Sequence, residues 1–311
     1  MRLIFCGTPQ FAVPTLEALI ARGFAFDLVV TNPDEPSGRS YGLKPPPVKV
    51  VAEKAGLQIF QPKSLKDAAT QAFLSKYRPD AIVVVAYGHL IPPWMIDLPG
   101  LGCINLHASL LPKYRGAAPI AWALIQGERT TGVTTMKIDS GLDTGDILLI
   151  RETGIRDDDT AKTLSSRLSI IGAELMVETL GRLERGEIVP LPQDHSQATL
   201  APRLKKEDGR IDWSLTAEET ARRVRGLQPW PGAYTTFRGK NLRLWAATPA
   251  ATESSHALDR GTVMTSGDKL LVVCGQGTVL EVRELQLEGR KRMCVRDFLN
   301  GVHVKEREKL G

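Results

Sequence analysis

The sequence predicts an α/β fold: a Rossmann-like, mostly parallel sheet with helices on both faces, followed by a small C-terminal β-barrel of OB-like type. Two observations predict it. Strand-like and helix-like segments alternate through the first two-thirds of the 311 residues, as in βαβ units. Beyond residue 208, short strand-like runs separated by glycine-containing turns replace this alternation. We therefore expect an α/β domain at 1–189, a linker at 190–208 and a β-barrel domain at 209–311.

The elements follow from apolar runs, periodicity and their glycine or proline ends. The strands expected in the first domain are 2–6, 28–31, 58–60, 81–86, 103–107, 133–138 and 147–150, and the helices are 14–22, 48–55, 68–77, 117–126 and 160–185. The run 81–86 is continuously apolar and β-branched, as in a strand buried on both faces. The strands expected in the second domain are 234–237, 242–246, 261–264, 269–273 and 279–285.

Composition excludes several classes of protein. The apolar run at the start is too short for a signal peptide, and the longest apolar run is far below the roughly 20 residues that span a bilayer. The four cysteines, at 6, 103, 274 and 294, lack metal-binding or redox spacing, so we expect reduced thiols and no metal. We expect a cytoplasmic protein that has no membrane partner.

The net charge of +5 is concentrated near the end of the chain. Residues 1–208 hold 23 basic and 23 acidic residues, whereas residues 209–311 hold 17 basic against 12 acidic residues. Such asymmetry favours a polyanionic partner such as a nucleic acid. The alternative is that the excess charge only keeps the surface soluble.

A polar pair closes the predicted strand 103–107. Asn105 and His107 lie two residues apart and therefore project from one face, while Ile104 and Leu106 face the opposite layer. The carboxyl end of a parallel strand is where open α/β sheets bind ligands. The carboxamide could donate a hydrogen bond to a developing oxyanion, and the imidazole could move a proton near neutral pH. The alternative is that Asn105 caps a turn and His107 binds a backbone carbonyl.

A cluster of acids lies between the last two predicted strands of the first domain. Asp139, Asp143 and Asp146 fall within eight residues that also contain two glycines, which predicts a tight turn presenting carboxylates. Aspartate and glycine also form turns that have no other role. A carboxylate that reached His107 would fix the tautomer of its ring, as in a catalytic triad. The spacing does not distinguish the three acids.

Two further segments bear on the ligand. Gly7-Thr8-Pro9 follows the first predicted strand, but GxGxxG is absent and the proline lacks the amide that a phosphate would bind, so we do not expect a nicotinamide enzyme. The long loop 32–49 contains five prolines and the basic residues Arg39 and Lys44. A loop of this length is usually functional, and the alternative is a mobile surface loop.

Several of these segments together resemble the methionyl-tRNA formyltransferase family, in its order and spacing. They are Gly7–Ala12, Val83–Gly88, Cys103–Gly116 and Gly141–Ile147. The SLLP…RG and GLDTGDI motifs within them are typical of the wider group that uses 10-formyltetrahydrofolate as formyl donor. Arg210–Ser214 and Pro229–Pro231 resemble the family's C-terminal domain, so the likeness covers nearly the whole chain.

The resemblance implies an enzyme that formylates methionine on initiator tRNA for translation initiation, with 10-formyltetrahydrofolate as co-substrate. Its catalytic trio falls on Asn105, His107 and Asp143. The implied folate-binding residues are Ser109, Leu110, Leu111 and Pro112, with the pteridine against the loop of Tyr87, Gly88, His89 and Leu90. The implied tRNA contacts include Arg39, Lys44 and phosphate-binding side chains of the basic C-terminal domain. We expect a monomer.

Two rival functions are weighed against this one. A formyltransferase for a small amine, such as glycinamide ribonucleotide or an amino sugar, would use the same trio but leaves the C-terminal charge and the basic loop unexplained. An RNA-binding module with an inert Rossmann-like domain fits the charge but not the presence of Asn105, His107 and Asp143.

Overall fold

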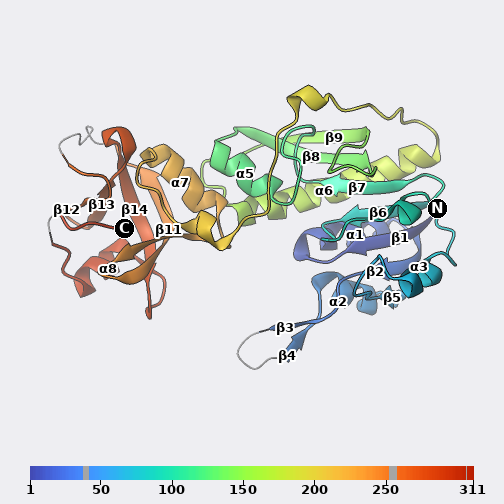
Figure 1. Cartoon of the computed structure of the whole chain (residues 1–311), viewed down its shortest axis with the longest axis horizontal. Helices are drawn as coiled ribbons and strands as arrows, with labels where there is room; N and C mark the ends of the chain where they lie inside the picture. Colours follow the sequence, from blue (N-terminus) through green and yellow to red (C-terminus); the bar gives the residue numbers. More distant parts are fainter. Residues whose placement is uncertain (38–41, 252–257, 306) are drawn as a thin grey trace. The chain divides into compact units, whose positions relative to one another are not determined.

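The computed structural model describes residues 1–37, 42–251, 258–305 and 307–311 (Figure 1). Its internal contacts divide the chain into two compact units. The first unit comprises residues 1–119, 130–154 and 165–201, and the second comprises 120–129, 155–164 and 202–311.

The first unit is built on a seven-stranded sheet of order β5-β2-β1-β6-β7-β8-β9. The strands are β1 (Arg2–Gly7), β2 (Ala25–Val30), β5 (Ile59–Phe60), β6 (Ala81–Val85), β7 (Cys103–His107), β8 (Thr130–Lys137) and β9 (Ile147–Gly154). Neighbours from β5 to β7 are parallel, and β8 is antiparallel to both β7 and β9. The prediction of a mostly parallel sheet is confirmed. Every residue of β6 is buried, as its continuous apolar run predicts.

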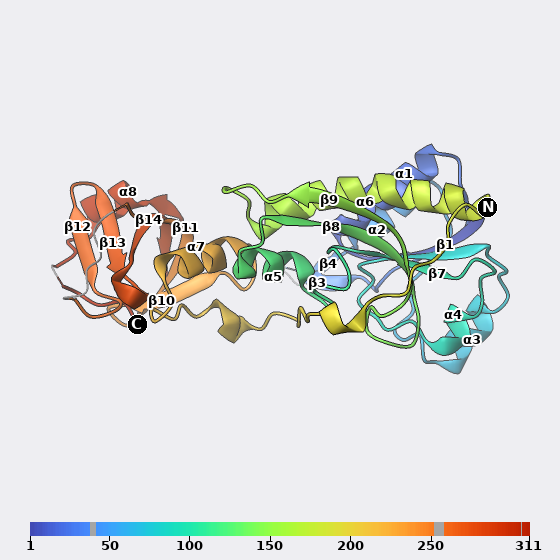
Figure 2. The same ribbon diagram turned by 90° about the horizontal axis from the view of Figure 1, so that it is seen from above.

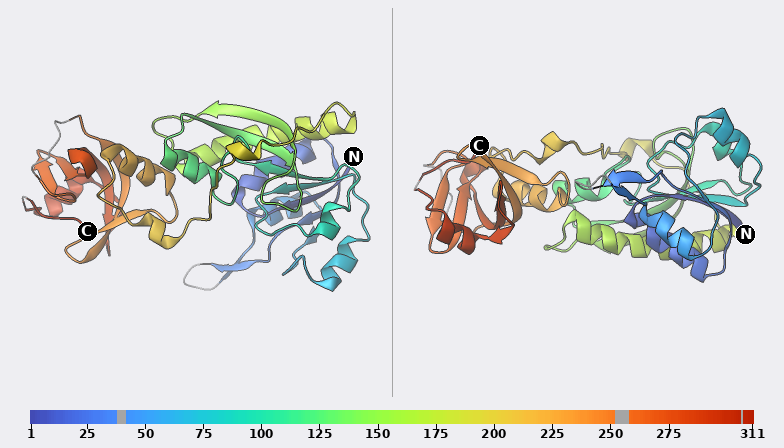
Figure 3. Two further views of the ribbon diagram at one scale, coloured as in Figure 1. Left: turned by 45° about the horizontal axis from the view of Figure 1, so that its top comes forward. Right: turned by 90° about the horizontal axis from the view of Figure 1, so that it is seen from below.

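Helices cover both faces of this sheet. They are α1 (Val13–Ala21), α2 (Pro47–Lys54), α3 (Ala68–Leu74), α4 (Pro93–Ile96) and α6 (Ala161–Glu184). Helices α1, α2 and α6 lie on one face, and α3 and α4 lie on the other (Figures 2 and 3). A Cβ atom added to Gly172 of α6 would lie 2.6 Å from Leu106 Cδ2, so α6 packs closely on the Leu106 side of β7. Asn105 and His107 therefore project from the opposite face, as predicted.

A short hairpin projects from the first unit. The segment 32–49, predicted as an irregular loop, contains β3 (Glu35–Ser37) paired with β4 (Gly42–Lys44). The tip between these strands lies outside the described residues. Lys49, from α2, donates to both carboxylate oxygens of Asp34 at 2.7 and 2.8 Å, and Gln61 donates to the same carboxylate at 2.8 Å. These bonds fix the base of the hairpin to the body of the unit.

The second unit contains an antiparallel sheet of order β10-β11-β14-β13-β12, with β15 paired to β14. The strands are β10 (Ala233–Phe237), β11 (Lys240–Pro249), β12 (Val263–Ser266), β13 (Lys269–Val273), β14 (Val279–Leu287) and β15 (Met293–Cys294), and the helices are α5 (Pro119–Gln126), α7 (Ala217–Gly226) and α8 (Val295–Gly301). A buried core joins the sheet to α7 and α8, with Val224 and Phe298 among its members. The predicted small antiparallel β domain after the α/β domain is confirmed.

No helix in the described ranges is both long enough and apolar enough to cross a lipid bilayer. No three His, Cys, Asp or Glu side chains in the same ranges gather as the ligands of a metal ion would.

Candidate active site

The carboxyl end of β7 carries the predicted polar pair. Asn105 pairs with Val84 of β6 on one side and with Met136 of β8 on the other, and its side chain is half-buried. Within the described part of the chain, its carboxamide has no hydrogen-bond partner. A partly accessible amide donor without a partner is suited to bind an oxygen atom of a ligand.

His107 is held by a backbone carbonyl. Its side chain is only 6% exposed, and Nε2 lies 2.9 Å from the carbonyl oxygen of Tyr114. A carbonyl can only accept a hydrogen bond, so Nε2 must carry a proton. In the neutral ring Nδ1 then carries the lone pair. The backbone, rather than a carboxylate, therefore fixes the tautomer of His107.

Asp143 is the acid that the structure brings to this ring. Its Oδ2 lies 3.6 Å from His107 Nδ1, which is longer than a direct hydrogen bond. The same oxygen accepts a hydrogen bond of 2.8 Å from the backbone amide of Gly116. Asp139 instead accepts bonds from Thr144 and the Gly141 amide within its own turn. The side of the ring with the lone pair thus faces a carboxylate that is fixed in place.

Polar groups of the loop itself and of β8 hold the loop after β7 in place. Ser109 Oγ donates to the carbonyl of Lys113 at 2.6 Å, and Thr134 of β8 donates to the carbonyl of Ser109 at 2.7 Å. Thr134 Oγ1 also accepts the amide of Leu111 at 3.2 Å. Leu111 is buried, whereas Leu110 and Pro112 are partly exposed. Of the four predicted folate-binding residues, these last two offer apolar surface to a ligand.

The loop of Tyr87, Gly88, His89 and Leu90 follows β6, the parallel neighbour of β7. Tyr87 is 2% exposed and lies in the core cluster of the first unit, so a ligand outside that core would meet its backbone rather than its ring. Gly88 adopts a positive φ of 86°, and His89 and Leu90 are exposed. The loops after β6 and β7 both lie at the carboxyl ends of these neighbouring parallel strands.

The nearby thiols do not contribute a nucleophile. Burial raises the pKa of Cys103 to about 12, and burial raises that of Cys6 well above its ordinary value. Both thiols stay protonated at neutral pH, whereas a cysteine nucleophile acts as the thiolate.

Sequence reasoning missed the residues that hold these loops. Gln193 lies in the predicted linker, yet it is buried and donates to the carbonyl oxygens of Asp143 and Gly145. Its oxygen accepts from the guanidinium of Arg115, which is also buried. No local pattern marks either residue, because the contacts join positions about 50 and 80 residues apart.

Of the two residues predicted to contact tRNA, only Lys44 lies in the part of the chain that the structure describes. Arg39 lies outside the described residues. Lys44 ends β4, is exposed, and forms no ion pair with a described residue. It pairs across the hairpin with Glu35 in the backbone ladder.

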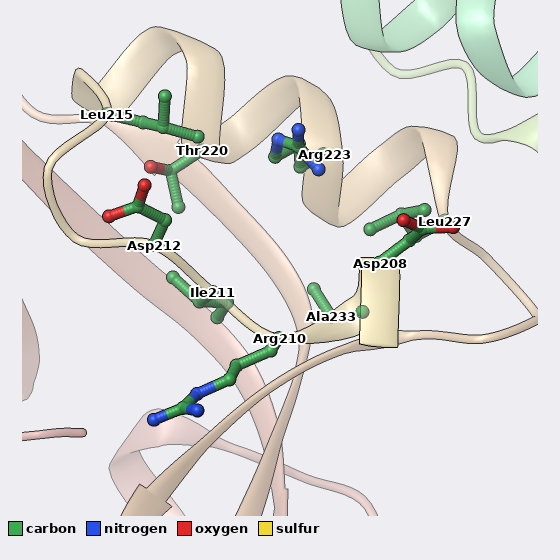
Figure 4. Close-up of a pocket in the computed structure, with 10 residues that line it drawn as sticks. Asp208, Arg210, Ile211, Asp212, Leu215, Thr220, Arg223, Leu227 and Ala233 are labelled. Carbon is green, nitrogen blue, oxygen red and sulfur yellow. The ribbon is translucent and has the colours of Figure 1, made fainter. Parts of the chain in front are cut away.

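The described part of the second unit contains a pocket, a groove and a basic aromatic surface. Figure 4 shows a pocket between α7 and the segment 208–212, with Ile211 and Leu227 among its apolar lining. A groove of about 580 Å³ is lined by Arg210, Tyr234 and neighbouring residues. Neither contains a predicted catalytic residue.

The basic aromatic surface centres on Trp245. The guanidinium carbons of Arg243 and Arg292 lie 5.3 and 4.8 Å from the centre of its ring. Its indole nitrogen donates to Gln286 at 3.2 Å, which fixes the ring against the sheet. Arg292 also forms an ion pair with Glu284, and Arg243 donates from Nη2 to the carbonyl of Pro231 at 3.1 Å. The remaining N–H groups of these arginines are suited to contact phosphates and bases.

Comparisons with known proteins find relatives that match this chain over its whole length. A family model described as formyl transferase matches residues 1–180, and one described as formyl transferase, C-terminal domain, matches residues 203–303. The methionyl-tRNA formyltransferase of Koribacter versatilis is 54% identical over 100% of this chain and 99% of its own. That of Acidobacterium capsulatum is 53% identical over 100% of both chains.

Solved structures share the fold at lower identity. The sugar 3N-formyl transferase WlaRD, solved with dTDP and 5-N-formyl-THF, gives a TM-score of 0.69 at 16% identity, covering 94% of this chain and 99% of its own. HypX from Aquifex aeolicus in complex with tetrahydrofolic acid gives 0.64 at 20% identity, covering 98% of this chain and 48% of its own. At these identities the likeness concerns the fold alone.

Proposed function

The chain belongs to the formyl transferase family, and from this we propose that it transfers a formyl group from 10-formyltetrahydrofolate to the α-amino group of methionine on initiator tRNA. The product would be formylmethionyl-tRNA for translation initiation. The observation that carries the proposal is the group formed by Asn105, His107 and Asp143 at the end of β7. The tRNA substrate is supported by the full-length similarity to relatives named methionyl-tRNA formyltransferase.

The first step would be attack of the methionine amine on the formyl carbon of the folate. A C–N bond forms, the formyl oxygen becomes an oxyanion, and the attacking nitrogen becomes cationic. The nitrogen then loses one proton to His107 Nδ1, the ring atom that carries the lone pair. No acyl-enzyme is required, because the substrate supplies the nucleophile.

Asn105 would stabilise the oxyanion. Its carboxamide has no hydrogen-bond partner in the described ranges, so its NH₂ group is free to donate to the substrate. A neutral donor does not bring a competing charge into the site, and removal of one oxyanion donor typically costs about 10²–10³ in turnover.

The second step breaks the bond between the formyl carbon and N10 of the folate. The proton held on His107 Nδ1 would pass to N10, which leaves as a neutral amine, and the oxyanion collapses to the amide carbonyl. Between the two steps the ring is an imidazolium that donates from both nitrogens, to Tyr114 and toward Asp143. The carboxylate stabilises that charge, directly or through a water molecule.

The folate would lie across the loops after β6 and β7. Leu110 and Pro112 would provide apolar contacts, and the backbone around Gly88 would provide polar ones. Gly132 of β8 leaves no room for a side chain beside Leu110, because a Cβ atom there would lie 2.3 Å from the carbonyl oxygen of Arg151 and 2.5 Å from Leu110 Cδ2.

The tRNA would be held by the hairpin β3–β4 and by the second unit. Lys44 and Arg39 would act from the hairpin, and the arginines on Trp245 from the second unit. The free state of all four cysteines suits a reducing cytoplasm, where we place the enzyme.

The test is formyl transfer from 10-formyltetrahydrofolate to charged initiator methionyl-tRNA, with elongator methionyl-tRNA as control. We expect formylated product from the initiator and much less from the elongator. Transfer to a free amino sugar with no dependence on tRNA would contradict the tRNA substrate while leaving the trio in place. Consumption of no folate, with tRNA binding intact, would contradict formyl transfer itself.

A further inference from the structure

One buried glutamine joins the acid turn to the loop after β7. Gln193 is 6% exposed. Its Nε2 donates to the carbonyls of Asp143 and Gly145 at 2.9 and 2.7 Å. Its Oε1 accepts from Nε and Nη2 of Arg115 at 3.1 and 2.6 Å. The carboxamide thus uses both of its N–H donors and both oxygen lone pairs.

Arg115, the partner of that oxygen, lies between the two backbone groups that contact the His–Asp pair. The carbonyl before it, of Tyr114, accepts from His107, and the amide after it, of Gly116, donates to Asp143. Arg115 is 7% exposed, and its own amide and carbonyl bond to Thr199 and Ala201 at 2.8 and 2.7 Å. A shift of Arg115 would therefore move both sides of the pair.

Asp143 needs such a restraint. Its φ is 51°, in the left-handed region that a residue with a side chain rarely adopts. Its carboxylate lies 3.6 Å from His107 Nδ1 without a direct hydrogen bond to the ring, so the ring does not hold it in place. The restraint comes from Gly116 on the carboxylate and from Gln193 on the backbone.

We propose that Gln193 is a positioning residue for formyl transfer, which clamps the Asp143–Gly145 turn to Arg115 and so sets the carboxylate against His107. The inference rests on the proposed function for its kinetic consequence, and on geometry alone for the position of Asp143. The 191–201 segment lies in the linker that the sequence predicts. The proposal assigns this segment a role in the site.

The kinetic test is Gln193→Glu. Glutamate keeps the shape and the acceptor for Arg115, but it places an oxygen against two carbonyl oxygens where the glutamine donates. We expect kcat to fall about 10²-fold, with KM for both substrates changed by less than about twofold, because a small displacement of a catalytic group costs turnover rather than binding. The matched control is Gln197→Glu, an exposed glutamine of the same segment, which should leave kcat unchanged.

A double-mutant cycle separates positioning from a general structural effect. In an Asp143→Asn background no carboxylate remains to be positioned, so Gln193→Glu should lower kcat by less than about threefold further. An equal loss in both backgrounds would overturn the proposal. Unchanged kcat in the single variant would overturn it as well.

Hydrogen exchange of the Gly116 amide tests the position without using activity, because that amide donates to Asp143 Oδ2 at 2.8 Å. We expect faster exchange in Gln193→Glu and unchanged exchange in Gln197→Glu. A wild-type chain that transfers no formyl group would contradict the proposed function, yet this measurement would still decide the position of Asp143. Full protection of Gly116 in Gln193→Glu would overturn the positioning role.

Discussion

The carbonyl of Tyr114 determines which nitrogen of His107 can act as a base. This carbonyl oxygen accepts the hydrogen bond from the protonated Nε2. Nδ1 is therefore the nitrogen that can receive a proton from the substrate. Asp143 stands on that side of the ring at 3.6 Å. This differs from a serine-protease triad, in which the carboxylate binds the protonated nitrogen and the opposite nitrogen reacts. In the proposed reaction the acid would face the reacting side, where it would stabilise the imidazolium after the transfer.

Asp143→Asn tests this role. The substitution keeps the size of the side chain but removes the charge that stabilises the imidazolium, so we expect kcat to fall by about 10²–10⁴. Binding of tRNA, measured by filter retention, should be unchanged. Asp146→Asn, in the same turn, is the matched control and should retain kcat. Near-normal turnover of Asp143→Asn would rule out the assignment.

Asn105→Ala tests the oxyanion donor. Removal of the carboxamide should lower kcat by about 10²–10³, because its hydrogen bond to the substrate oxygen strengthens as charge develops. KM for the folate should change little. The opposite pattern, a raised KM with normal kcat, would show that Asn105 binds the ground state and does not stabilise the intermediate.

At the scale of elements, the approach of the 191–201 segment to the loop after β7 depends on a glycine. Gly116 has a φ of 119°, and a Cβ atom there would lie 2.7 Å from the carbonyl oxygen of Ala201. We expect Gly116→Ala to destabilise the protein by ~1–3 kcal/mol and to lower kcat, since the Gly116 amide would move away from Asp143. Denaturant unfolding and turnover measure the two effects.

Gly100→Ala is the control for that substitution. Gly100 has no atom within 4 Å of an added Cβ and no positive φ. The free energy of unfolding of the Gly100→Ala variant should stay within about 0.5 kcal/mol of wild type. Equal behaviour of the two alanine variants would contradict the argument from close approach.

The base of the hairpin β3–β4 depends on a charged carboxylate. Hydrogen bonds from Gln61 and then Lys49 hold the pKa of Asp34 below its usual value of 3.8. For a carboxyl group with a lowered pKa, the stabilisation is complete above the unfolded value and is lost as the pH falls through the folded value. The anchor should therefore not vary with pH at neutrality.

Asp34→Asn should loosen the hairpin at neutral pH. Without the charge the contact with Lys49 weakens, and we expect the amides of Glu35 and Lys44 to exchange about two- to fivefold faster, as for a partly exposed ion pair. Asp157→Asn, an exposed acid of the second unit, serves as control. Unchanged exchange in Asp34→Asn would show that the backbone alone fixes the hairpin.

The elements that could be predicted are those whose own residues determine them. The continuous apolar run of β6 and the alternating pattern of β7 were sufficient to predict these strands. A strand buried on both faces leaves the first pattern, and a strand with two different faces leaves the second. Helix α7 was missed, although Thr216 and Glu219 form a capping box at its start. The hairpin was missed because three-residue strands flanked by prolines leave no periodic pattern.

The site could be predicted only in part. The same-face argument predicted that Asn105 and His107 project together, since it needs no contact beyond the strand. Asp143 could be distinguished from its neighbouring acids only by resemblance, and the structure separates them by the contact at 3.6 Å. Gln193 depends entirely on tertiary contacts, so no sequence pattern pointed to it.

At the scale of the whole molecule, the excess of positive charge lies apart in the sequence from the proposed catalytic residues. The excess of 17 basic over 12 acidic residues lies in 209–311, whereas the trio lies in the balanced part of the chain. A polyanionic substrate would therefore be attracted mainly by residues that take no part in the reaction. Salt should then act on tRNA affinity far more than on kcat.

The turn between β14 and β15 tests this separation. Arg290 and Lys291 are exposed and form no ion pair with a described residue, and Arg292 beside them stacks on Trp245. Replacing both Arg290 and Lys291 with glutamine should lower the slope of log Kd against log salt by about 1.5, since each phosphate contact contributes about 0.7–0.9. At saturating tRNA, kcat should equal that of wild type.

Lys63→Gln with Lys66→Gln makes the same change of charge on exposed lysines of the first unit. If general attraction by net charge governs binding, the slope of log Kd against log salt will fall by the same amount in both double variants. If the turn contacts phosphates, only the Arg290 and Lys291 variant will lose it. The second result is the one we expect, because a screened charge acts on tRNA chiefly within the Debye length of about 8 Å at physiological ionic strength.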